Sequence, residues 1–437
     1  MGLTVNEIVE QYLKTTRDYR TQEILHKLVE CGSGKLGYHI DVCDSCGIVK
    51  VIANPCNHSL CTVCQERRSK LWIESRIPEL LPVPHYHIIF CLIADLSDFA
   101  MFNKKLVYDS MFIAVASAMN EIPERDNIEI GFISSLHTST ASLWYKLHMH
   151  VCTPGIGLLK NGKVNKYTSI ESLRMTEEQL QKKFRDVILE NLQKKYLEDA
   201  RKIEEDNMEE VLSWSEEEDY EDEKAERIKW PESLKELKDD EQKFNKWIEQ
   251  LRNKKWDVEI GNPRKSEAEK RSLIEYIGQR LPITDRQLIE ADDETVIFKD
   301  KRGKKIVMAT EEFIRRLKTH IMPPYYHRIR NYGFLSNPIK TKKLKEIREK
   351  LGLGEAEKNV SMIIDCKECG KGEMQTVATL LGGGTVKTFE KNIKKLKKLP
   401  GWLSPLQEVD SLPKAPPEVV SKLPDWLIEL IQSVDDY

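Results

Sequence analysis

Cysteines dominate one short stretch near the N-terminus of this chain. Six of the ten cysteines fall between residues 31 and 64, and four of them form two C-x2-C pairs, Cys43-x-x-Cys46 and Cys61-x-x-Cys64, separated by 14 residues. Each pair offers two thiolates from one tight turn, which is the spacing of tetrahedral zinc sites. A segment this small has no apolar core of its own, so zinc binding, worth on the order of 10 kcal/mol, would supply its folding free energy. The sequence therefore predicts a small structural zinc-binding domain.

The number of zinc ions and the pairing of their ligands stay open at the level of sequence. The simplest set for one ion is the two pairs themselves, Cys43, Cys46, Cys61 and Cys64. The other potential ligands nearby are a second set of four, Cys31, His39, Cys56 and His58. Any interleaved pairing fits the spacing equally well, so one or two structural Zn²⁺ ions are expected.

Length, composition and charge bound the remaining possibilities. With 437 residues and 40% hydrophobic content, the chain can form two or three domains. No apolar run approaches the roughly 20 residues of a membrane helix, and the N-terminus lacks a basic-then-apolar signal segment. Cysteines in such a chain favour metal binding or burial over disulfides. We therefore expect a cytoplasmic protein with no membrane partner.

Charge is strongly segregated although the net charge is only -3. The stretch 204–226 is acidic, whereas 328–350 and 387–398 are basic and suit a polyanion. Five residues of the first basic stretch are interpreted as nucleic-acid contacts, through phosphates or base stacking: Arg328, Arg330, Tyr332, Lys342 and Lys343. Solvated helix faces and core aromatic residues are an equally good interpretation.

Apolar periodicity predicts an α+β architecture. Helices are expected within 5–28, at 65–81, 106–120, 266–280 and 311–320, and strands at 87–93, 128–135, 147–153, 256–260, 296–298 and 306–308. A charged, helix-favouring insertion spans about 160–252, and its acidic run is interpreted as a solvated loop. The last ninety residues are expected to be a basic, loosely structured tail, in which Cys366-x-x-Cys369 is interpreted as two ordinary cysteines or half of an incomplete zinc site.

Two histidines share one face of the predicted strand at 147–153. Because side chains alternate along a strand, His148 and His150 point the same way with Cα atoms about 6.5 Å apart, and can bind one divalent ion. The best third ligand is His137, which a hairpin would bring to the same face; His85 and His87 are its competitors. An isolated H-x-H pair is more often structural. Three imidazoles with open positions would form a Lewis acid for a phosphodiester and would suit zinc or manganese better than magnesium.

The helix predicted at 266–280 offers a nucleophile, Tyr276, with Arg280 one turn later. A phenol with a pKa near 10 is neutral at pH 7, so it needs a metal, a base or a cation before it can attack phosphate. Such an attack would leave a phosphotyrosine that conserves the phosphodiester bond energy. Packing of the tyrosine against the sheet is the structural alternative.

Taken in order, these segments resemble the rolling-circle transposases of the insertion sequence ninety-one type, in the HUH endonuclease superfamily. The matching stretches cover about residues 25–337 and are Cys31-Gly to His39, Cys43-Asp-Ser-Cys46-Gly, Cys56 to Gln65, Leu81-Pro-Val-Pro84 with His87-Ile-Ile-Phe90, Leu136-His-Thr138, His148-Met-His150, Trp256, Tyr276-Ile-Gly278, Glu312-Phe-Ile-Arg-Arg316 and Arg328-Ile-Arg-Asn-Tyr-Gly333. No single piece is decisive, but the ordered set is specific.

The resemblance implies a zinc-binding domain at 1–80 that contacts DNA, and an HUH nuclease domain at 81–345 with an antiparallel sheet flanked by helices, followed by the tail at 346–437. It implies that His148 and His150 bind a catalytic Mg²⁺ or Mn²⁺. It also implies that Tyr276 nicks single-stranded DNA, keeping the 5′ end as a phosphotyrosine and releasing a 3′-OH. Members usually carry two tyrosines four residues apart, and here Arg280 takes the second position, which identifies a single-tyrosine variant.

The expected function is therefore transposition by nicking and rejoining single-stranded DNA at transposon ends and in target DNA. With one tyrosine, strand exchange would need reuse of Tyr276, another tyrosine or a second subunit, so a homodimer is a possible partner state. The expected location is the cytoplasm, in association with the bacterial nucleoid. The alternatives are a plasmid replication initiator or relaxase, and a non-catalytic zinc-dependent DNA-binding protein.

Overall fold

The computed structural model describes residues 3–15, 25–125, 127–167, 175–212, 227–300, 302–354, 364–381, 385–408 and 417–435. Two compact units emerge from the contacts between residues. Unit 1 combines residues 1–75, 283–315 and 359–437, and unit 2 combines 76–282 and 316–358. Each unit is thus assembled from stretches that are distant in sequence, whereas the sequence suggested three consecutive blocks. Within the described residues, no helix is both long and apolar enough to cross a membrane.

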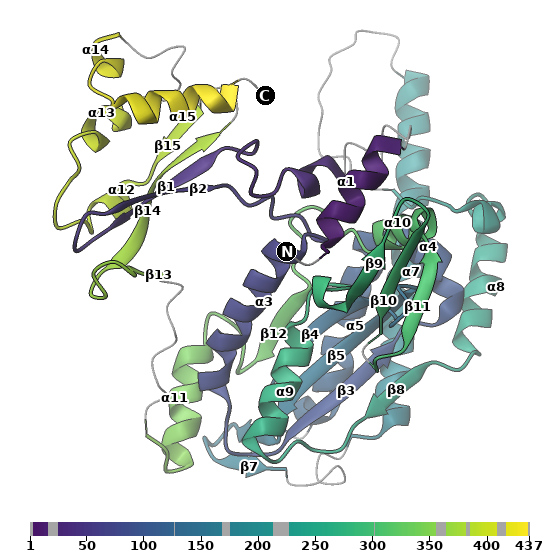
Figure 1. Cartoon of the computed structure of the whole chain (residues 1–437). Helices are drawn as coiled ribbons and strands as arrows, with labels where there is room; N and C mark the ends of the chain where they lie inside the picture. The colour runs from purple at the N-terminus through teal and green to yellow at the C-terminus, as the bar shows by residue number, and fades with distance from the viewer. Residues whose placement is uncertain are drawn as a thin grey trace. The chain divides into compact units, whose positions relative to one another are not determined.

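Unit 2 is built on a seven-stranded sheet whose order is β7-β6-β4-β5-β3-β8, with β12 also paired to β4. Its central strands are β3 (His85–Cys91), β4 (Ile128–Ser139) and β5 (Tyr145–Pro154), and its outer strands are β6 (Ile156–Leu159), β7 (Val164–Lys166), β8 (Asp257–Ile260) and β12 (Ile329–Gly333). All of these strand pairs are antiparallel. The predicted α+β class with an antiparallel sheet is confirmed (Figure 1).

The two faces of this sheet have different partners because side chains alternate along β5. Leu147, Met149 and Val151 are buried in an apolar core. Helices α5 (Lys104–Arg125) and α7 (Glu177–Leu212) supply much of the rest of that core. His148 and His150 therefore lie on the opposite face, where α9 (Glu267–Gly278) packs against β4 and β5. The short elements before α5 are η1 (Ile77–Glu79), η2 (Ala94–Leu96) and α4 (Ser97–Phe102).

The charged insertion predicted at about 160–252 is helical, as expected, but it also contributes buried residues to the core of unit 2. Helix α7 buries an apolar stripe that includes Phe184 and Ile188, and α8 (Glu241–Arg252), which follows η3 (Glu232–Leu237), buries Phe244 and Ile248. Tyr196 of α7 stacks on Phe244 with ring centroids 4.0 Å apart. Charge alone misled the prediction, because long charged side chains also line the outer faces of packed helices. The side chains of the acidic run at 204–226 lie outside the described residues.

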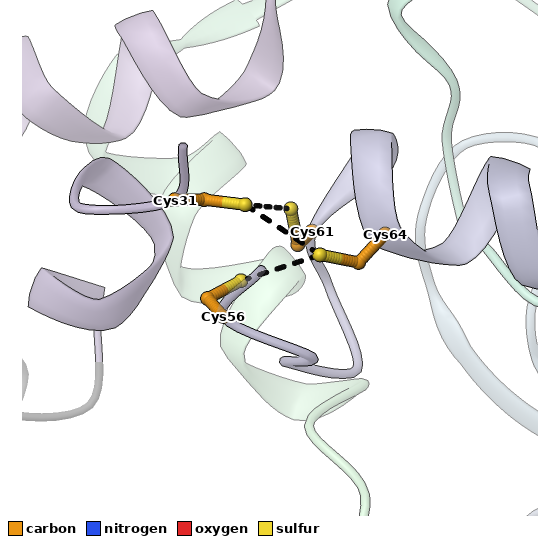
Figure 2. A group of neighbouring side chains, drawn as sticks. All are labelled: Cys31, Cys56, Cys61 and Cys64. Carbon is orange, nitrogen blue, oxygen red and sulfur yellow. Dashed lines mark hydrogen bonds between the residues drawn. The ribbon is translucent and has the colours of Figure 1, made fainter. Parts of the chain in front are cut away.

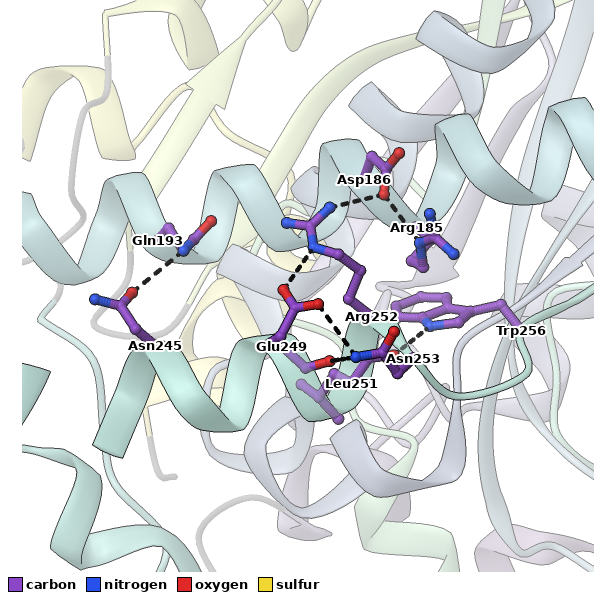
Figure 3. Close-up of polar contacts among 9 residues, drawn as sticks. All are labelled: Arg185, Asp186, Gln193, Asn245, Glu249, Leu251, Arg252, Asn253 and Trp256. Carbon is purple, nitrogen blue, oxygen red and sulfur yellow. Dashed lines mark hydrogen bonds and ion pairs between the residues drawn. The ribbon is translucent and has the colours of Figure 1, made fainter. Parts of the chain in front are cut away.

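Polar contacts hold α8 against α7 and tie the residue before β8 to the end of α8 (Figure 3). Arg252 of α8 donates to Asp186 of α7 at 2.9 Å, and Asp186 also accepts from Arg185 at 2.9 Å. The indole of Trp256 is buried and donates to the carbonyl of Leu251 at 2.9 Å. These contacts fix the chain just before β8, which forms one edge of the sheet.

Unit 1 contains a five-stranded antiparallel sheet built from the two ends of the chain. Strands β1 (Tyr38–Cys43) and β2 (Val49–Ala53) come from the N-terminal part, and β13 (Ile364–Asp365), β14 (Glu373–Leu381) and β15 (Thr385–Thr388) come from the C-terminal part. The order is β13-β14-β1-β2, with β15 also paired to β14. The short helices α12 (Glu390–Ile393), α13 (Leu403–Gln407), α14 (Pro417–Val420) and α15 (Asp425–Asp435) bury Leu403, Leu406 and Leu427 with β1 and β14.

The prediction of a loosely structured C-terminal tail is therefore wrong for much of its length. Strand β14 pairs with β1 over a register that runs from Tyr38 with Leu380 to Cys43 with Met374, and Figure 1 shows the two strands side by side. The basic stretch 328–350 ends in α11 (Lys340–Lys350), which belongs to unit 2. The sequence hides this fold because β14 is paired with a strand more than 300 positions earlier, which also adds Ile40 and Val42 to the core.

The remaining elements of unit 1 are α1 (Val5–Thr15), α3 (Thr62–Arg76), η4 (Asp285–Gln287) and the meander β9 (Leu288–Ala291), β10 (Thr295–Lys299) and β11 (Lys305–Ala309), which leads into α10 (Thr310–Thr319). The carboxylate of Asp285 accepts from the Val5 amide at 2.9 Å and from the Thr62 hydroxyl at 2.8 Å. One acidic side chain thereby joins the starts of α1 and α3.

Candidate metal and nucleophile site

Three histidines of unit 2 converge on the face of the sheet that α9 covers. His137 of β4 lies directly across from His148 of β5 in the strand register, and His150 lies two residues further along β5. One ring nitrogen from each lies within 4.8 Å of the others. Ring centroids are 4.4 Å apart for His137 and His150, and 4.8 Å for His148 and His150. These are the histidines that the sequence analysis grouped, and their donors suit one divalent ion.

The end of β4 is shaped to carry His137. The β4–β5 register shifts between His137 and Ser139, as a bulge does when it redirects a strand. Just beyond it, buried His320 contacts the Thr138 hydroxyl at 3.0 Å and the Leu143 carbonyl at 3.1 Å. Burial lowers the pKa of His320 to about 4, so its ring is neutral at pH 7 and can donate one hydrogen bond and accept another. His320 therefore supports the turn without adding charge to the site.

A fourth histidine, His87 of β3, contacts the group without belonging to it. Its Nε2 lies 2.9 Å from Nδ1 of His150. Burial, aided by the charge of Arg264, lowers the pKa of His87 to about 4. A neutral His87 can fix the tautomer of His150 with the proton on Nδ1, so that Nε2 of His150 is the nitrogen that can ligate a metal. The other competitor, His85, is buried and its Nδ1 contacts the Val83 carbonyl at 2.9 Å.

Tyr276 reaches the histidines from α9. The ring centroid of Tyr276 lies 4.8 Å from that of His150, 5.7 Å from that of His137 and 5.9 Å from that of His87. The helix begins with a capping box between Ser266 and Glu269, which fixes its first turn. The side chain of Tyr276 is 36% exposed, so a substrate can reach the phenol. Burial of the remainder raises the pKa of Tyr276 above its usual value.

The sequence predicted a helix that continues to Arg280, one turn after Tyr276. In the structure α9 ends at Gly278 and Gln279 is extended, so Arg280 lies beyond the helix. The carbonyl of Arg280 instead accepts a hydrogen bond from the guanidinium of Arg328. The i to i+4 rule holds only within a helix, so it does not apply to Tyr276 and Arg280.

The residues predicted to contact nucleic acid are mostly engaged within unit 2. Arg328 is buried, and Arg330 pairs with Asp109 at 2.6 Å. Tyr332 stacks on Phe132 at a centroid distance of 4.8 Å, and Lys343 pairs with Glu129 at 2.9 Å. Lys342 is exposed on α11. Of the five, Lys342 is the residue best placed to meet a phosphate, and the others position β12 and α11.

In unit 1, four cysteines form a compact sulfur cluster (Figure 2). The four are Cys31, Cys56, Cys61 and Cys64, with sulfur–sulfur distances of 3.5 Å for Cys31 and Cys64, 3.6 Å for Cys31 and Cys61, and 3.8 Å for Cys56 and Cys64. A tetrahedral Zn–S₄ centre with bonds of about 2.3 Å has edges of about 3.8 Å. The cluster therefore has the size of a zinc site.

Both predicted ligand sets are wrong in their pairing. The two C-x2-C pairs do not share a site, because Cys43 and Cys46 group instead with Cys366 and Cys369. The structure also places neither predicted histidine in a cysteine cluster. His39 contacts the Asn54 amide oxygen at 3.1 Å, and Nδ1 of His58 accepts from the Leu60 amide.

The protonation chemistry of the first cluster favours a cation. Contacts from Cys56 and Cys64 lower the pKa of Cys61 to about 2, whereas contact with Cys61 raises the pKa of Cys56. One thiolate is thus stabilised at the expense of its neighbours, because four negative sulfurs this close repel one another. A divalent ion removes that conflict and allows all four to ionise. The donor set supports structural zinc.

Comparisons with known proteins agree with this geometry. The family described as "Transposase zinc-binding domain" matches residues 4–92, and the family described as "Putative transposase" matches residues 131–343. A Sinorhizobium fredii protein described as "Putative transposase y4qJ" is 28% identical over 377 residues, which cover 80% of this chain and 85% of that protein. No solved structure matches significantly. Together the two family matches cover most of the chain and identify it as a transposase similar to those of the insertion sequence ninety-one type, and transposases are enzymes that cut DNA and transfer its strands.

Proposed function

We propose that this transposase is an HUH-type enzyme that nicks and rejoins single-stranded DNA through a covalent 5′-phosphotyrosine, in rolling-circle transposition. One observation carries the proposal: the phenol ring of Tyr276 lies against His137 and His150, two members of a three-histidine group. A nucleophile beside a divalent-metal site is the arrangement that phosphoryl transfer requires. The ends of the transposon and the target DNA are the proposed substrates.

Nicking by Tyr276 exchanges one phosphorus–oxygen bond for another. Its hydroxyl oxygen bonds to the scissile phosphorus while the bond between phosphorus and the 3′ oxygen breaks. The phenol loses its proton and the departing 3′ oxygen gains one, which leaves a 5′-phosphotyrosine and a free 3′-OH. Because burial raises the pKa of Tyr276, proton loss must be coupled to attack at neutral pH. The reverse reaction, with another strand's 3′-OH as the nucleophile, rejoins the DNA.

His137, His148 and His150 are the proposed ligands of the catalytic ion, Mg²⁺ or Mn²⁺, and three imidazoles favour Mn²⁺. When bound, such an ion supplies Lewis-acid polarisation of a phosphate oxygen. The chain's own contribution is to hold the three imidazoles on two rigid strands and to bring Tyr276 to them from α9. Strands hold such geometry more accurately than loops.

The single tyrosine limits how strand exchange proceeds. Arg280 occupies the position four residues after Tyr276 but lies beyond the end of α9, and its carbonyl contacts Arg328. One chain is therefore proposed to hold one phosphotyrosine at a time. Exchange then requires reuse of Tyr276 after rejoining, or a second subunit, which makes a homodimer part of the proposal. We propose the cytoplasm, at the nucleoid, as the site of action.

The proposal is tested by incubating the full chain with labelled single-stranded oligonucleotides from the ends of its element, with Mn²⁺ or Mg²⁺. We expect a denaturation-resistant protein–DNA adduct and a shorter oligonucleotide with a 3′-OH. Chelation of the divalent ion should abolish both, and His148→Ala with His150→Ala should reduce them by at least about 100-fold. Binding of authentic ends without any adduct would instead support a non-catalytic DNA-binding protein.

His87 is predicted to be a positioning residue for His150. Because its contact at 2.9 Å sets the tautomer of His150, His87→Ala should weaken Mn²⁺ affinity by about 10–100-fold. Saturating Mn²⁺ should restore most of the nicking rate, which can be measured by titrating Mn²⁺ in the adduct assay. His85→Ala is a matched control, since His85 contacts Val83 instead. An unchanged Mn²⁺ dependence in His87→Ala would contradict this role.

A further inference from the structure

The second cysteine cluster joins two hairpins of unit 1. The turn between β1 and β2 carries Cys43 and Cys46, and the turn between β13 and β14 carries Cys366 and Cys369. Because β1 pairs with β14 and Cys43 lies opposite Met374, the two turns meet at the same end of the sheet. Pairing of distant strands thus brings together thiols that are 320 or more residues apart.

The two turns have the same local geometry. In each, the amide of the glycine after the second cysteine donates to the carbonyl of the first cysteine, at 3.0 Å for Gly47 and 2.9 Å for Gly370. Both glycines have positive φ, 74° and 62°. In the first turn, the amides of Ser45 and Cys46 both point at the Cys43 sulfur at 3.4 Å. Amides directed at sulfur stabilise a thiolate, so this turn is prepared for a ligand.

The contact between the turns is close and specific. A Cβ atom on Gly372 would lie 2.5 Å from the Cys43 sulfur and 2.6 Å from Cβ of Ser45, so a larger residue would push the turns apart. Asp44 ties the turns together, because its amide donates to the Glu373 carbonyl and its carboxylate accepts from the Glu373 amide, both at 2.9 Å. These contacts hold the sulfurs of one turn against those of the other.

The four sulfurs have the spacing of a metal site. Cys43 and Cys369 are 3.8 Å apart, and Cys46 and Cys366 are 3.7 Å apart, so both distances run between the turns. They match the edge of about 3.8 Å of a tetrahedral Zn–S₄ centre. A disulfide needs sulfurs about 2.0 Å apart, and both of these distances are much longer.

We propose that Cys43, Cys46, Cys366 and Cys369 bind a second structural Zn²⁺, which locks the C-terminal hairpin to the N-terminal one. The match to the zinc-binding domain ends at residue 92, so the two C-terminal ligands lie outside it. The site makes the zinc-binding region of this chain discontinuous. This inference does not depend on the chemistry proposed for Tyr276.

The test is zinc stoichiometry measured by atomic emission on the purified full chain. We expect about two ions per chain in the wild type and about one in the double variant Cys366→Ser with Cys369→Ser. Cys61→Ser should also bind about one, since it removes a ligand of the other cluster. Cys91→Ser, a cysteine outside both clusters, should keep two. A double variant that keeps the wild-type zinc content, or a wild type with only one ion, would overturn the proposal.

Differential alkylation of the wild type gives a readout that does not depend on a variant folding. Cys46 is exposed to solvent, so its thiol should react readily with iodoacetamide unless a metal holds it. We expect at least a tenfold slower reaction of Cys46 and Cys369 before zinc is chelated than afterwards. Equal rates before and after chelation would contradict the site, and so would a Cys46–Cys366 disulfide found by mass spectrometry.

Discussion

Tyr276→Phe is expected to abolish the covalent protein–DNA adduct while leaving the histidine site able to bind its metal. The change removes one oxygen atom, the proposed nucleophile, and keeps the ring that lies 4.8 Å from His150 and 5.7 Å from His137. Loss of a nucleophile typically lowers turnover by at least about 1,000-fold. Because the change keeps the ring and removes only a hydroxyl from a residue that is 36% exposed, little effect on the free energy of unfolding is expected.

The measurement is the yield of denaturation-resistant adduct on single-stranded end sequences, with Mn²⁺ affinity measured in parallel. Tyr196→Phe is the matched control, because it removes the same hydroxyl from another tyrosine of unit 2. Tyr196 lies in α7 and stacks on Phe244 of α8, so it is not part of the histidine site. It should retain the adduct. Equal adduct yields from Tyr276→Phe and the wild type would show that another group attacks the phosphate. Loss of Mn²⁺ binding as well would show that the variant damages the site itself.

The strand histidines and the tyrosine helix could be predicted from sequence because their signals are local. Alternation places His148 and His150 on one face, and the turn that follows β4 returns β5 so that His137 lies opposite His148. The role of His87 was harder to foresee. That role depends on the pairing of β5 with β3, in which His87 lies opposite Cys152 and its ring reaches diagonally to His150. No local spacing in the sequence encodes this pairing.

The ligand sets of the cysteines were predicted wrongly for a physical reason. Neighbouring C-x2-C pairs suggest one shared ion, but pairing of β1 with β14 places Cys43 and Cys46 beside Cys366 and Cys369. The ligands that complete the first cluster, Cys31 and Cys56, come from the turns flanking β1 and β2. Sequence spacing reports which thiols share a turn, whereas strand pairing between distant segments decides which turns meet.

The same long-range pairing explains the error over the C-terminal segment. Leu380 is buried against residues that the sequence analysis placed in another domain, among them Ile40 and Val42. The segment supplies most of this core itself, but its sheet is completed by β1, and local spacing does not reveal a pairing with a strand so far away in sequence. The charged insertion shows the converse, since its apolar stripe was hidden among many lysines and glutamates.

Cys61→Ser is expected to remove zinc from the first cluster and to unfold the segment around it. Structural zinc in small domains contributes about 10–16 kcal/mol, which is comparable to the whole stability of a typical domain, about 5–15 kcal/mol. Cys61 precedes the first turn of α3, and its sulfur lies 3.6 Å from that of Cys31. Without the ion, the loop at 56–61 and the start of α3 lose their main link to Cys31.

Limited proteolysis mapped by mass spectrometry, together with zinc content, measures this effect. We expect new cleavage within residues 25–76 of Cys61→Ser, and the same cleavage in the wild type after zinc is chelated. Val63→Ser is the matched control, because Val63 lies in the same C-x2-C turn, is 62% exposed and supplies no ligand. It should keep its zinc and resist protease. If Cys61→Ser instead loses its zinc but keeps the wild-type cleavage pattern, packing alone holds this region. The hydrogen bonds from Val5 and Thr62 to Asp285 would then be the first contacts to examine.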